Sequence, residues 1–208
     1  MSHHGIWCEY CDKTLPYLSP AHCPNCALPT LLGEVCGHCL KKPPAFTHTS
    51  AVFSYQFPID RLILAFKYHE QLALAQIFSE KLLQNIGQND LPDYVIPMPL
   101  HPAKLRSRGF NQAKLIATPL ARALHLPQLA CRRLRDTPSQ TSLPWHERSN
   151  NVRGAFSCDI DLSGKHIALV DDVFTTGASL NELAVAVKSR GANRVSAWVV
   201  ARTIKNTG

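Results

Sequence analysis

Apolar and polar residues follow clear periods only after about residue 50. The run AVFSY predicts a short strand, and residues 59–68 and 71–83 place apolar side chains at helical spacing. YVIPMP is a short apolar run closed by prolines, which is typical of a buried strand that leads into a loop. A basic loop follows, and Asn111 is then expected to cap a helix that ends near residue 124.

The last third of the chain continues the alternation of strands and helices. HIALV predicts a strand, residues 178–190 a helix, and VSAWVVA a final strand. The polar residues 136–151 hold two prolines and predict a long loop. Strands that alternate with helices indicate an α/β fold, with a mostly parallel sheet flanked by helices.

The first 44 residues have a different pattern. They contain six of the eight cysteines, show neither a helical nor an alternating apolar period, and end in KKPP. We therefore predict a small metal-binding module with a linker over residues 1–44 and an α/β domain over residues 45–208. We expect the two parts to have separate hydrophobic cores.

Six cysteines of the N-terminal module form three successive CxxC pairs: Cys8 and Cys11, Cys23 and Cys26, Cys36 and Cys39. Two such pairs supply four thiolates for one tetrahedral Zn²⁺, and a segment of this length needs a metal to fold. The predicted structural zinc ligands are Cys8, Cys11, Cys23 and Cys26. Cys36 and Cys39 are left as a further pair, which His22 or His38 would complete into a second site.

Length and composition narrow the class of protein. With 208 residues, 45% hydrophobic and 18% charged, the chain is sized for one α/β domain with a small appendage, and disorder, collagen and coiled coil are excluded. The sequence has neither an apolar run of about 20 residues nor the apolar core of a signal peptide. We expect a cytoplasmic protein without membrane insertion.

Positive charge is concentrated in residues 101–153. This segment holds ten Lys or Arg against two acidic residues, a net charge of +8, which exceeds the +7 of the whole chain. Such a segment fits a polyphosphate ligand, a nucleic-acid backbone or both, and a solvated basic surface without a ligand is the alternative.

The stretch IALVDDVFTTGAS carries the most specific chemistry. A buried strand is expected to end in two carboxylates, and a turn with hydroxyls and a glycine then leads into a helix. Successive backbone N–H groups at a helix N-terminus bind a phosphate, and neighbouring carboxylates accept hydrogen bonds from a vicinal diol. The pattern therefore predicts a site for a ribose 5-phosphate, formed by Asp171, Asp172, Thr175, Thr176, Gly177, Ala178 and Ser179.

Two other interpretations of the acidic pair stay open. Asp171 would be a magnesium ligand in an NTPase, but such an enzyme needs a P-loop, and Gly164-Lys165 lacks the rest of that motif. The pair would otherwise have only a capping or turn role.

IALVDDVFTTGAS resembles the signature by which type I phosphoribosyltransferases bind phosphoribosyl pyrophosphate (PRPP). Together with PLHPAKLRSRGFNQ and the CxxC pairs, it makes nearly the whole chain similar to the ComF family (ComFC/GntX-like) of competence proteins. The resemblance implies a phosphoribosyltransferase-type fold in which Asp171 and Asp172 bind ribose hydroxyls and residues 175–179 bind phosphate. It also implies a pyrophosphate-binding turn at residues 98–101, a mobile loop at 136–151, and Mg²⁺ bound with PRPP.

Arginines of the basic segment are candidate contacts to pyrophosphate or to DNA, because a guanidinium binds phosphate oxygens through two N–H groups. The predicted residues are Arg106, Arg108 and Arg148.

Three functions fit the resemblance. The first is a PRPP-binding protein that handles DNA taken up in natural transformation, with single-stranded DNA and other competence proteins as candidate partners. The second is an active phosphoribosyltransferase on an unidentified base or amine, although the sequence offers no hood segment for an acceptor. The third is a zinc-ribbon nucleic-acid binder whose phosphoribosyl site senses nucleotides.

Overall fold

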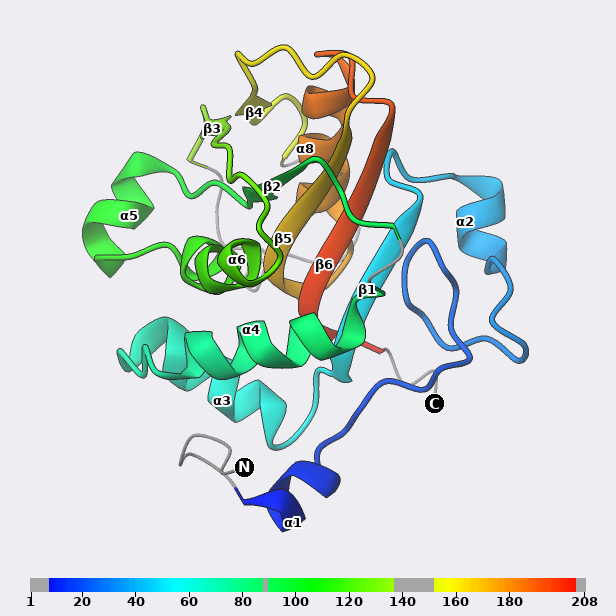
Figure 1. The fold of residues 1–208 in the computed structure, drawn as a ribbon, viewed down its shortest axis with the longest axis vertical. Helices are drawn as coiled ribbons and strands as arrows, with labels where there is room; N and C mark the ends of the chain where they lie inside the picture. The colour runs from blue at the N-terminus through cyan, green and yellow to red at the C-terminus, as the bar shows by residue number, and fades with distance from the viewer. Residues whose placement is uncertain (1–7, 88–89, 137–151, 205–208) are drawn as a thin grey trace.

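Four parallel strands form the central sheet of the computed structural model, which describes residues 8–87, 90–136 and 152–204. Their order is β1-β6-β5-β2, with β1 at His48–Ser54, β2 at Tyr94–Pro97, β5 at His166–Phe174 and β6 at Arg194–Arg202 (Figure 1). All three neighbouring pairs run parallel, so their carboxyl ends meet at one edge of the sheet. That edge is where ligands bind in open α/β sheets.

Three helices cover one face of the sheet: α3 (Ile59–Tyr68), α4 (Leu74–Asn85) and α6 (Gln112–Ala123). The helical spacing of their apolar residues predicts this packing, because Ile63, Phe66, Phe78 and Ile116 are fully buried against the strands. Asn111 caps α6 as predicted, and its side chain accepts a hydrogen bond from the backbone N–H of Lys114 at 3.2 Å.

The other face of the sheet packs against α8 (Ala178–Lys188) and against the cysteine-rich segment. Cys23, Cys26 and Cys39 belong to the same buried cluster as Phe46, Phe174 and the apolar residues of α8. The expectation of separate cores is therefore wrong, because the cysteine segment buries its sulfurs against the sheet domain itself. The division between residues 44 and 45 stays a prediction.

Other elements differ from the sequence expectations. The basic loop contains a helix, α5 (Pro102–Arg108), which begins with a proline in its first turn and ends at Gly109 in the left-handed conformation. β5 continues through both aspartates to Phe174, beyond the predicted end at the acidic pair. The short elements are α1 (Glu9–Lys13), α2 (Gly37–Lys41) and the antiparallel pair of β3 (Arg132–Arg133) and β4 (Phe156–Ser157).

No helix within the described residues is long and apolar enough to cross a membrane. Most of the predicted loop at residues 136–151 lies outside the described part of the chain.

Candidate functional site

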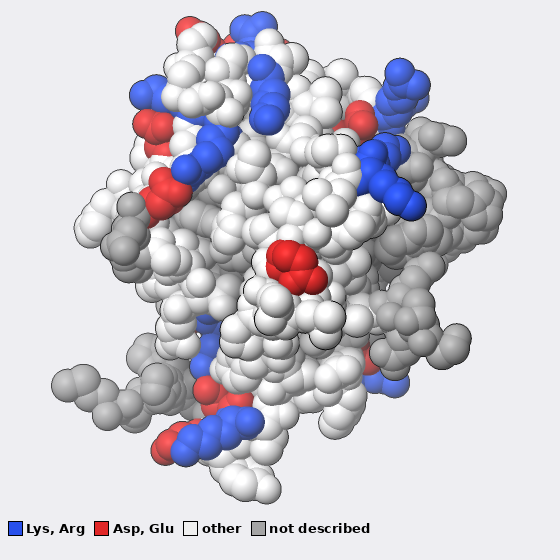
Figure 2. Space-filling view, turned by 90° about the vertical axis from the view of Figure 1, so that its right-hand side faces the viewer, with Lys and Arg blue, Asp and Glu red and all other residues white. Residues whose placement is uncertain are grey.

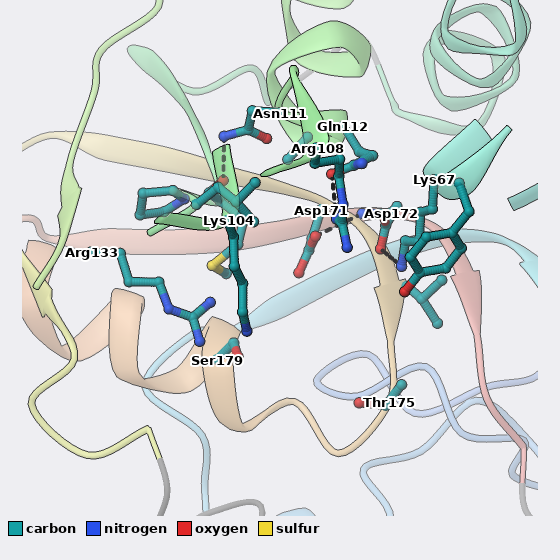
Figure 3. Close-up of a pocket in the computed structure, with 16 residues that line it drawn as sticks. Lys67, Lys104, Arg108, Asn111, Gln112, Arg133, Asp171, Asp172, Thr175 and Ser179 are labelled. Atoms are coloured by element: carbon teal, nitrogen blue, oxygen red, sulfur yellow. Dashed lines mark hydrogen bonds and ion pairs between the residues drawn. The ribbon is translucent and has the colours of Figure 1, made fainter. Parts of the chain in front are cut away.

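A cavity of about 180 Å³ opens at the carboxyl ends of β2 and β5. Its walls come from the end of α3, the turn after β2, helices α5 and α6, strand β3 and the start of α8 (Figure 3). Both predicted aspartates line it, as do Thr175 and Ser179 of the predicted phosphate loop. The turn after β2 contributes Met98, Pro99 and Leu100, so residues from distant parts of the sequence meet around one space.

The two aspartates have different surroundings. Asp172 is 6% exposed and forms an ion pair with Lys67 of α3, with 2.8 Å between Nζ and Oδ1. Asp171 accepts a hydrogen bond from the backbone N–H of Asp172 at 2.9 Å. Burial and the charge of Asp172 raise the pKa of Asp171 to about 7, although Lys67 opposes the shift. Asp171 therefore gains or loses its proton near neutral pH.

Lys67 is a site residue that the sequence interpretation missed. Burial lowers the pKa of Lys67, but the ion pair with Asp172 outweighs this and raises it, so the ammonium stays charged. The sequence did carry a sign of its role. Lys67 follows Ile63 by four residues and Ile59 by eight, which places it on the buried face of α3. A lysine on the otherwise apolar face of a helix indicates an acidic partner in the protein interior.

Three further cations line the cavity: Lys104, Arg108 and Arg133. In Figure 3, the charged ends of Lys104 and Arg133 point toward Ser179 at the start of α8. Burial and the neighbouring charge of Arg133 lower the pKa of Lys104. Lys104 also forms an ion pair with Asp136, with 3.7 Å between Nζ and Oδ1, and a phosphate at the start of α8 would add a second negative group for these two cations.

Of the three predicted arginines, the structure places one at the cavity. Arg108 reaches the cavity, where its guanidinium lies 5.2 Å from the Tyr68 ring and donates to Gln112 Oε1 at 2.9 Å. Arg106 is exposed on α5 and does not belong to the lining of the cavity. Arg148 lies outside the described residues.

Gln112 has a polar atom that fits a ligand. Its side chain lines the cavity and is 3% exposed, and Arg108 occupies its oxygen. Among the described residues and their contacts, its Nε2 has no hydrogen-bond partner. A buried amide donor without a partner is costly, so a ligand oxygen at this position would satisfy it.

The phosphate loop at Thr175–Ser179 depends on a glycine. Gly177 has φ of +79° at the N-cap of α8, and a Cβ atom there would lie 2.4 Å from Cε2 of Phe174. The ring of Phe174 is 2% exposed, so it cannot move away easily. Gly177 therefore lets the loop pass directly over the Phe174 ring and then enter helix α8.

Four cysteines form a second candidate site: Cys23, Cys26, Cys36 and Cys39, whose sulfur atoms all lie within 4.8 Å of one another. The set expected from the sequence is corrected, because Cys36 and Cys39 take the place of Cys8 and Cys11. Cys8 and Cys11 are exposed at α1, which an ion pair of 2.7 Å between Asp12 and Lys81 holds against α4, away from α2 (Figure 1).

The chemistry of the four-cysteine site fits Zn²⁺. Tetrahedral Zn–S bonds of about 2.3 Å place sulfurs roughly 3.8 Å apart, and the Sγ atoms of Cys26 and Cys36 are separated by 3.6 Å. Burial raises the pKa of Cys23, but hydrogen bonds from the backbone at Cys36, Cys26 and Asn25 outweigh it and lower the pKa to about 7. Backbone N–H groups that stabilise a thiolate are suited to a metal ligand.

Comparison with known proteins shows the family, although a scan against protein-family models finds no match. The sequence is 34% identical to the DNA utilization protein YhgH of Escherichia coli (strain K12), over 98% of this chain and 93% of that protein. The chain belongs to the ComF family. The ComF chain is also 30% identical to Competence protein F of Haemophilus influenzae, over 94% of this chain and 90% of that protein.

Solved structures with a partial likeness to the ComF chain include two phosphoribosyltransferases. A purine phosphoribosyltransferase from Pyrococcus horikoshii has a TM-score of 0.39 and 20% identity, and the match covers 65% of this chain and 84% of that one. The adenine phosphoribosyltransferase of Saccharomyces cerevisiae has a TM-score of 0.36 and 18% identity, covering 69% and 68%. The topology confirms the predicted α/β fold class, a parallel sheet flanked by helices with a small cysteine-rich N-terminal part.

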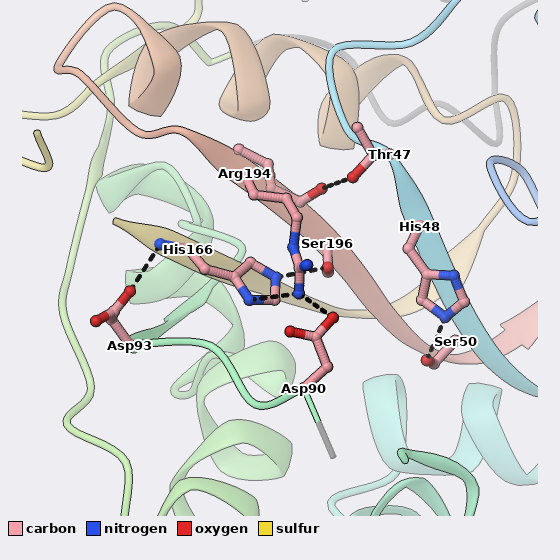
Figure 4. Close-up of polar contacts among 9 residues, drawn as sticks. Thr47, His48, Ser50, Asp90, Asp93, His166, Arg194 and Ser196 are labelled. Atoms are coloured by element: carbon pink, nitrogen blue, oxygen red, sulfur yellow. Dashed lines mark hydrogen bonds and ion pairs between the residues drawn. The ribbon is translucent and has the colours of Figure 1, made fainter. Parts of the chain in front are cut away.

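A second polar cluster of the ComF chain lies at the amino ends of the strands (Figure 4). Arg194 can only donate, so the 2.9 Å contact to His166 makes Nδ1 of that ring an acceptor. Nε2 then carries the proton and donates to Ser196 Oγ at 2.8 Å. His166 therefore cannot accept a proton from Ser196, and the pair is not a nucleophile with its base.

Replacing Gly177 with alanine tests the phosphate loop. Gly177→Ala should lower the free energy of unfolding by about 1 kcal/mol for the left-handed backbone and by about 1 to 3 kcal/mol more for the clash with Phe174. Gly164→Ala is the matched control, because Gly164 has φ of +73° with open space around it. Urea denaturation measures the free energy of unfolding of both variants. An equal loss in Gly177→Ala and Gly164→Ala would contradict the contact with Phe174.

Proposed function

We propose that this ComF chain binds PRPP with Mg²⁺ in the cavity at the carboxyl ends of β2 and β5. The observation that carries the proposal is the meeting of an acidic pair, a glycine turn at a helix N-terminus and four cationic side chains around one space. PRPP presents a diol between a phosphate at C5 and a pyrophosphate at C1, and this lining offers acceptors for the diol and donors for both anionic groups.

The geometry suggests how the parts of PRPP would lie. The 5-phosphate would lie on the N–H groups of residues 175–179, and the charged ends of Lys104 and Arg133, which point toward Ser179, would face it. Asp171 and Asp172 would accept hydrogen bonds from the ribose hydroxyls. The pyrophosphate would then lie toward the turn at residues 98–101 and toward Arg108.

Mg²⁺ fits this arrangement as a companion of PRPP. It keeps several waters and is usually bound by one or two carboxylates together with phosphate oxygens. The Asp171 carboxylate is the oxygen ligand of the chain that would hold it, while the ion supplies charge neutralisation at the pyrophosphate.

We further propose a cytoplasmic role in handling single-stranded DNA during natural transformation. The relatives named for DNA utilization and competence support this role, as does the basic charge of α5 and β3. Figure 2 shows the side of the molecule that lies at the right in Figure 1, where α2 is located. There, Lys and Arg side chains stand in separate groups, often beside acidic ones, so this face supports a nucleic-acid contact less than the α5 and β3 side does.

PRPP affinity should depend on pH through Asp171. Ribose hydroxyls donate to the ionised carboxylate, so binding favours ionisation and lowers the pKa from its value of about 7 in the free chain. Affinity should be constant above pH 7 and should fall by about tenfold per pH unit below it. Calorimetry from pH 5.5 to 8.5 measures this. The phosphates of the ligand also titrate, and Asp171→Asn is the control for this. If PRPP affinity falls with decreasing pH at the same slope in both proteins, the role of Asp171 is contradicted.

DNA binding should compete with PRPP and should depend on salt. Anisotropy of labelled single-stranded DNA is expected to show log affinity falling against log salt with a slope of about −0.7 per phosphate contacted. Arg108→Gln should weaken both ligands, whereas Arg106→Gln, on the exposed side of the same helix, should weaken DNA alone. DNA affinity that is unchanged in both variants would contradict a contact through α5.

A further inference from the structure

The buried arginine at the end of β6 connects the two candidate sites. Arg202 is 3% exposed, and its Nε donates to the carbonyl of Cys26 at 2.7 Å. Its Nη1 donates to the carbonyls of Phe174 at 2.9 Å and Thr175 at 2.6 Å. One guanidinium therefore joins the turn that carries two candidate metal ligands to the first residue of the phosphate loop.

Stacking reinforces this connection. The guanidinium of Arg202 lies 4.4 Å from the centre of the Phe174 ring, whose other contacts include Phe46 at 5.8 Å between ring centres. The position that a side chain would occupy at Gly177 is filled by the same ring. Cys26, Arg202, Phe174 and Gly177 thus form a continuous series of contacts from the cysteine site to the phosphate loop.

The electrostatic surroundings of Arg202 depend on what the cysteine site holds. Zn²⁺ with four thiolates has a net charge of −2, which a neighbouring guanidinium stabilises. Without a metal, no bonds join the four sulfurs, which lie within 4.8 Å of one another, so the Cys26 turn loses the ligand bonds that would fix its position. A shift of the Cys26 turn would remove the acceptor of Arg202 Nε and weaken the hold of the guanidinium on the Phe174 and Thr175 carbonyls, while its hydrogen bond to the Thr203 carbonyl at 2.8 Å would remain.

We propose that Arg202 couples the four-cysteine site to the phosphate loop, so that a metal at the cysteines and a phosphoribosyl ligand in the cavity strengthen each other's binding. The inference rests on the proposed function, because the second ligand is PRPP. Coupling of this kind is reciprocal, so each ligand must change the equilibrium affinity of the other by the same factor.

The first measurement uses the full wild-type chain. PRPP with Mg²⁺ is titrated by calorimetry into zinc-loaded protein and into protein stripped with a zinc-selective chelator. We expect PRPP to bind the loaded form about 5-fold to 150-fold more tightly. Zinc affinity, measured by competition with a chromophoric chelator, should rise by the same factor when PRPP is present.

The second measurement separates coupling from folding. Arg202→Met should keep one zinc per chain but bind PRPP about as weakly as the stripped wild type, with no further loss on stripping. Arg202→Lys keeps the charge but reaches fewer carbonyls, so its PRPP affinity should lie between the two. Arg194→Met is the matched control at the opposite end of β6, and its PRPP affinity should equal that of the wild type.

Three results would decide against the coupling. The first is that loaded and stripped wild type bind PRPP with equal affinity. The second is that zinc-loaded Arg202→Met binds PRPP as tightly as the wild type. The third is that Arg194→Met loses as much PRPP affinity as Arg202→Met. Failure of the zinc-loaded wild type to bind PRPP is distinguishable from these. It would overturn the proposed function and the inference with it.

Discussion

Replacing Asp171 and Asp172 together with asparagine is expected to lower PRPP affinity by roughly 10²-fold to 10⁴-fold, because each lost charge-assisted hydrogen bond contributes about 1.5 to 3 kcal/mol. The same double variant should melt at a lower temperature. Asp172 is the partner of the partly buried Lys67, and breaking such a pair costs up to about 3 kcal/mol. Calorimetry in the presence of Mg²⁺ measures the first effect, and thermal denaturation the second.

Two further variants separate binding from stability. Lys67→Met combined with Asp172→Asn removes both members of the ion pair and should regain much of the lost stability, yet it should still bind PRPP weakly. Asp93→Asn removes an exposed carboxylate at the opposite end of the sheet and should leave PRPP affinity unchanged. Full affinity in the double aspartate variant would exclude this cavity as the ribose site.

Changing one cysteine of the buried cluster should remove the metal and destabilise the whole chain. Cys26→Ser or Cys39→Ser is expected to reduce zinc from about one per chain to near zero and to lower the melting temperature by ~10 °C or more, because the ligands share a core with the sheet. Elemental analysis of protein purified without added metal measures the zinc content.

The control is the pair that the structure leaves outside the cluster. Cys8→Ser and Cys11→Ser should retain zinc, since both residues are exposed at α1. Loss of zinc from the Cys8 or Cys11 variants, with retention in the Cys39 variant, would restore the ligand set expected from the sequence.

The sequence was informative where local pattern decides structure. Helical spacing predicts α3 and α4, Asn111 predicts the start of α6, and the apolar runs predict β2, β5 and β6. The helix α5 was missed although its signals are present. Pro102 in its first turn and Gly109 after its end are typical of helix boundaries, but the dense basic charge between them favoured a loop.

Tertiary contacts decide what spacing alone leaves open. The three CxxC pairs have equal internal spacing, so only the packing of the chain shows that Cys36 and Cys39 join Cys23 and Cys26. Lys67 and Arg133 come from segments far from the acidic pair in sequence, and no motif connects them to it. Arg202 ends an apolar strand, and its carbonyl partners are identified only by the fold.

The most direct measurement is a structure of the chain determined with PRPP and Mg²⁺. We expect the 5-phosphate on the backbone N–H groups of residues 175–179, with the ribose hydroxyls on Asp171 and Asp172 and an oxygen of the ligand within hydrogen-bond distance of Gln112 Nε2. A PRPP molecule bound elsewhere, with the cavity filled by water alone, would contradict it.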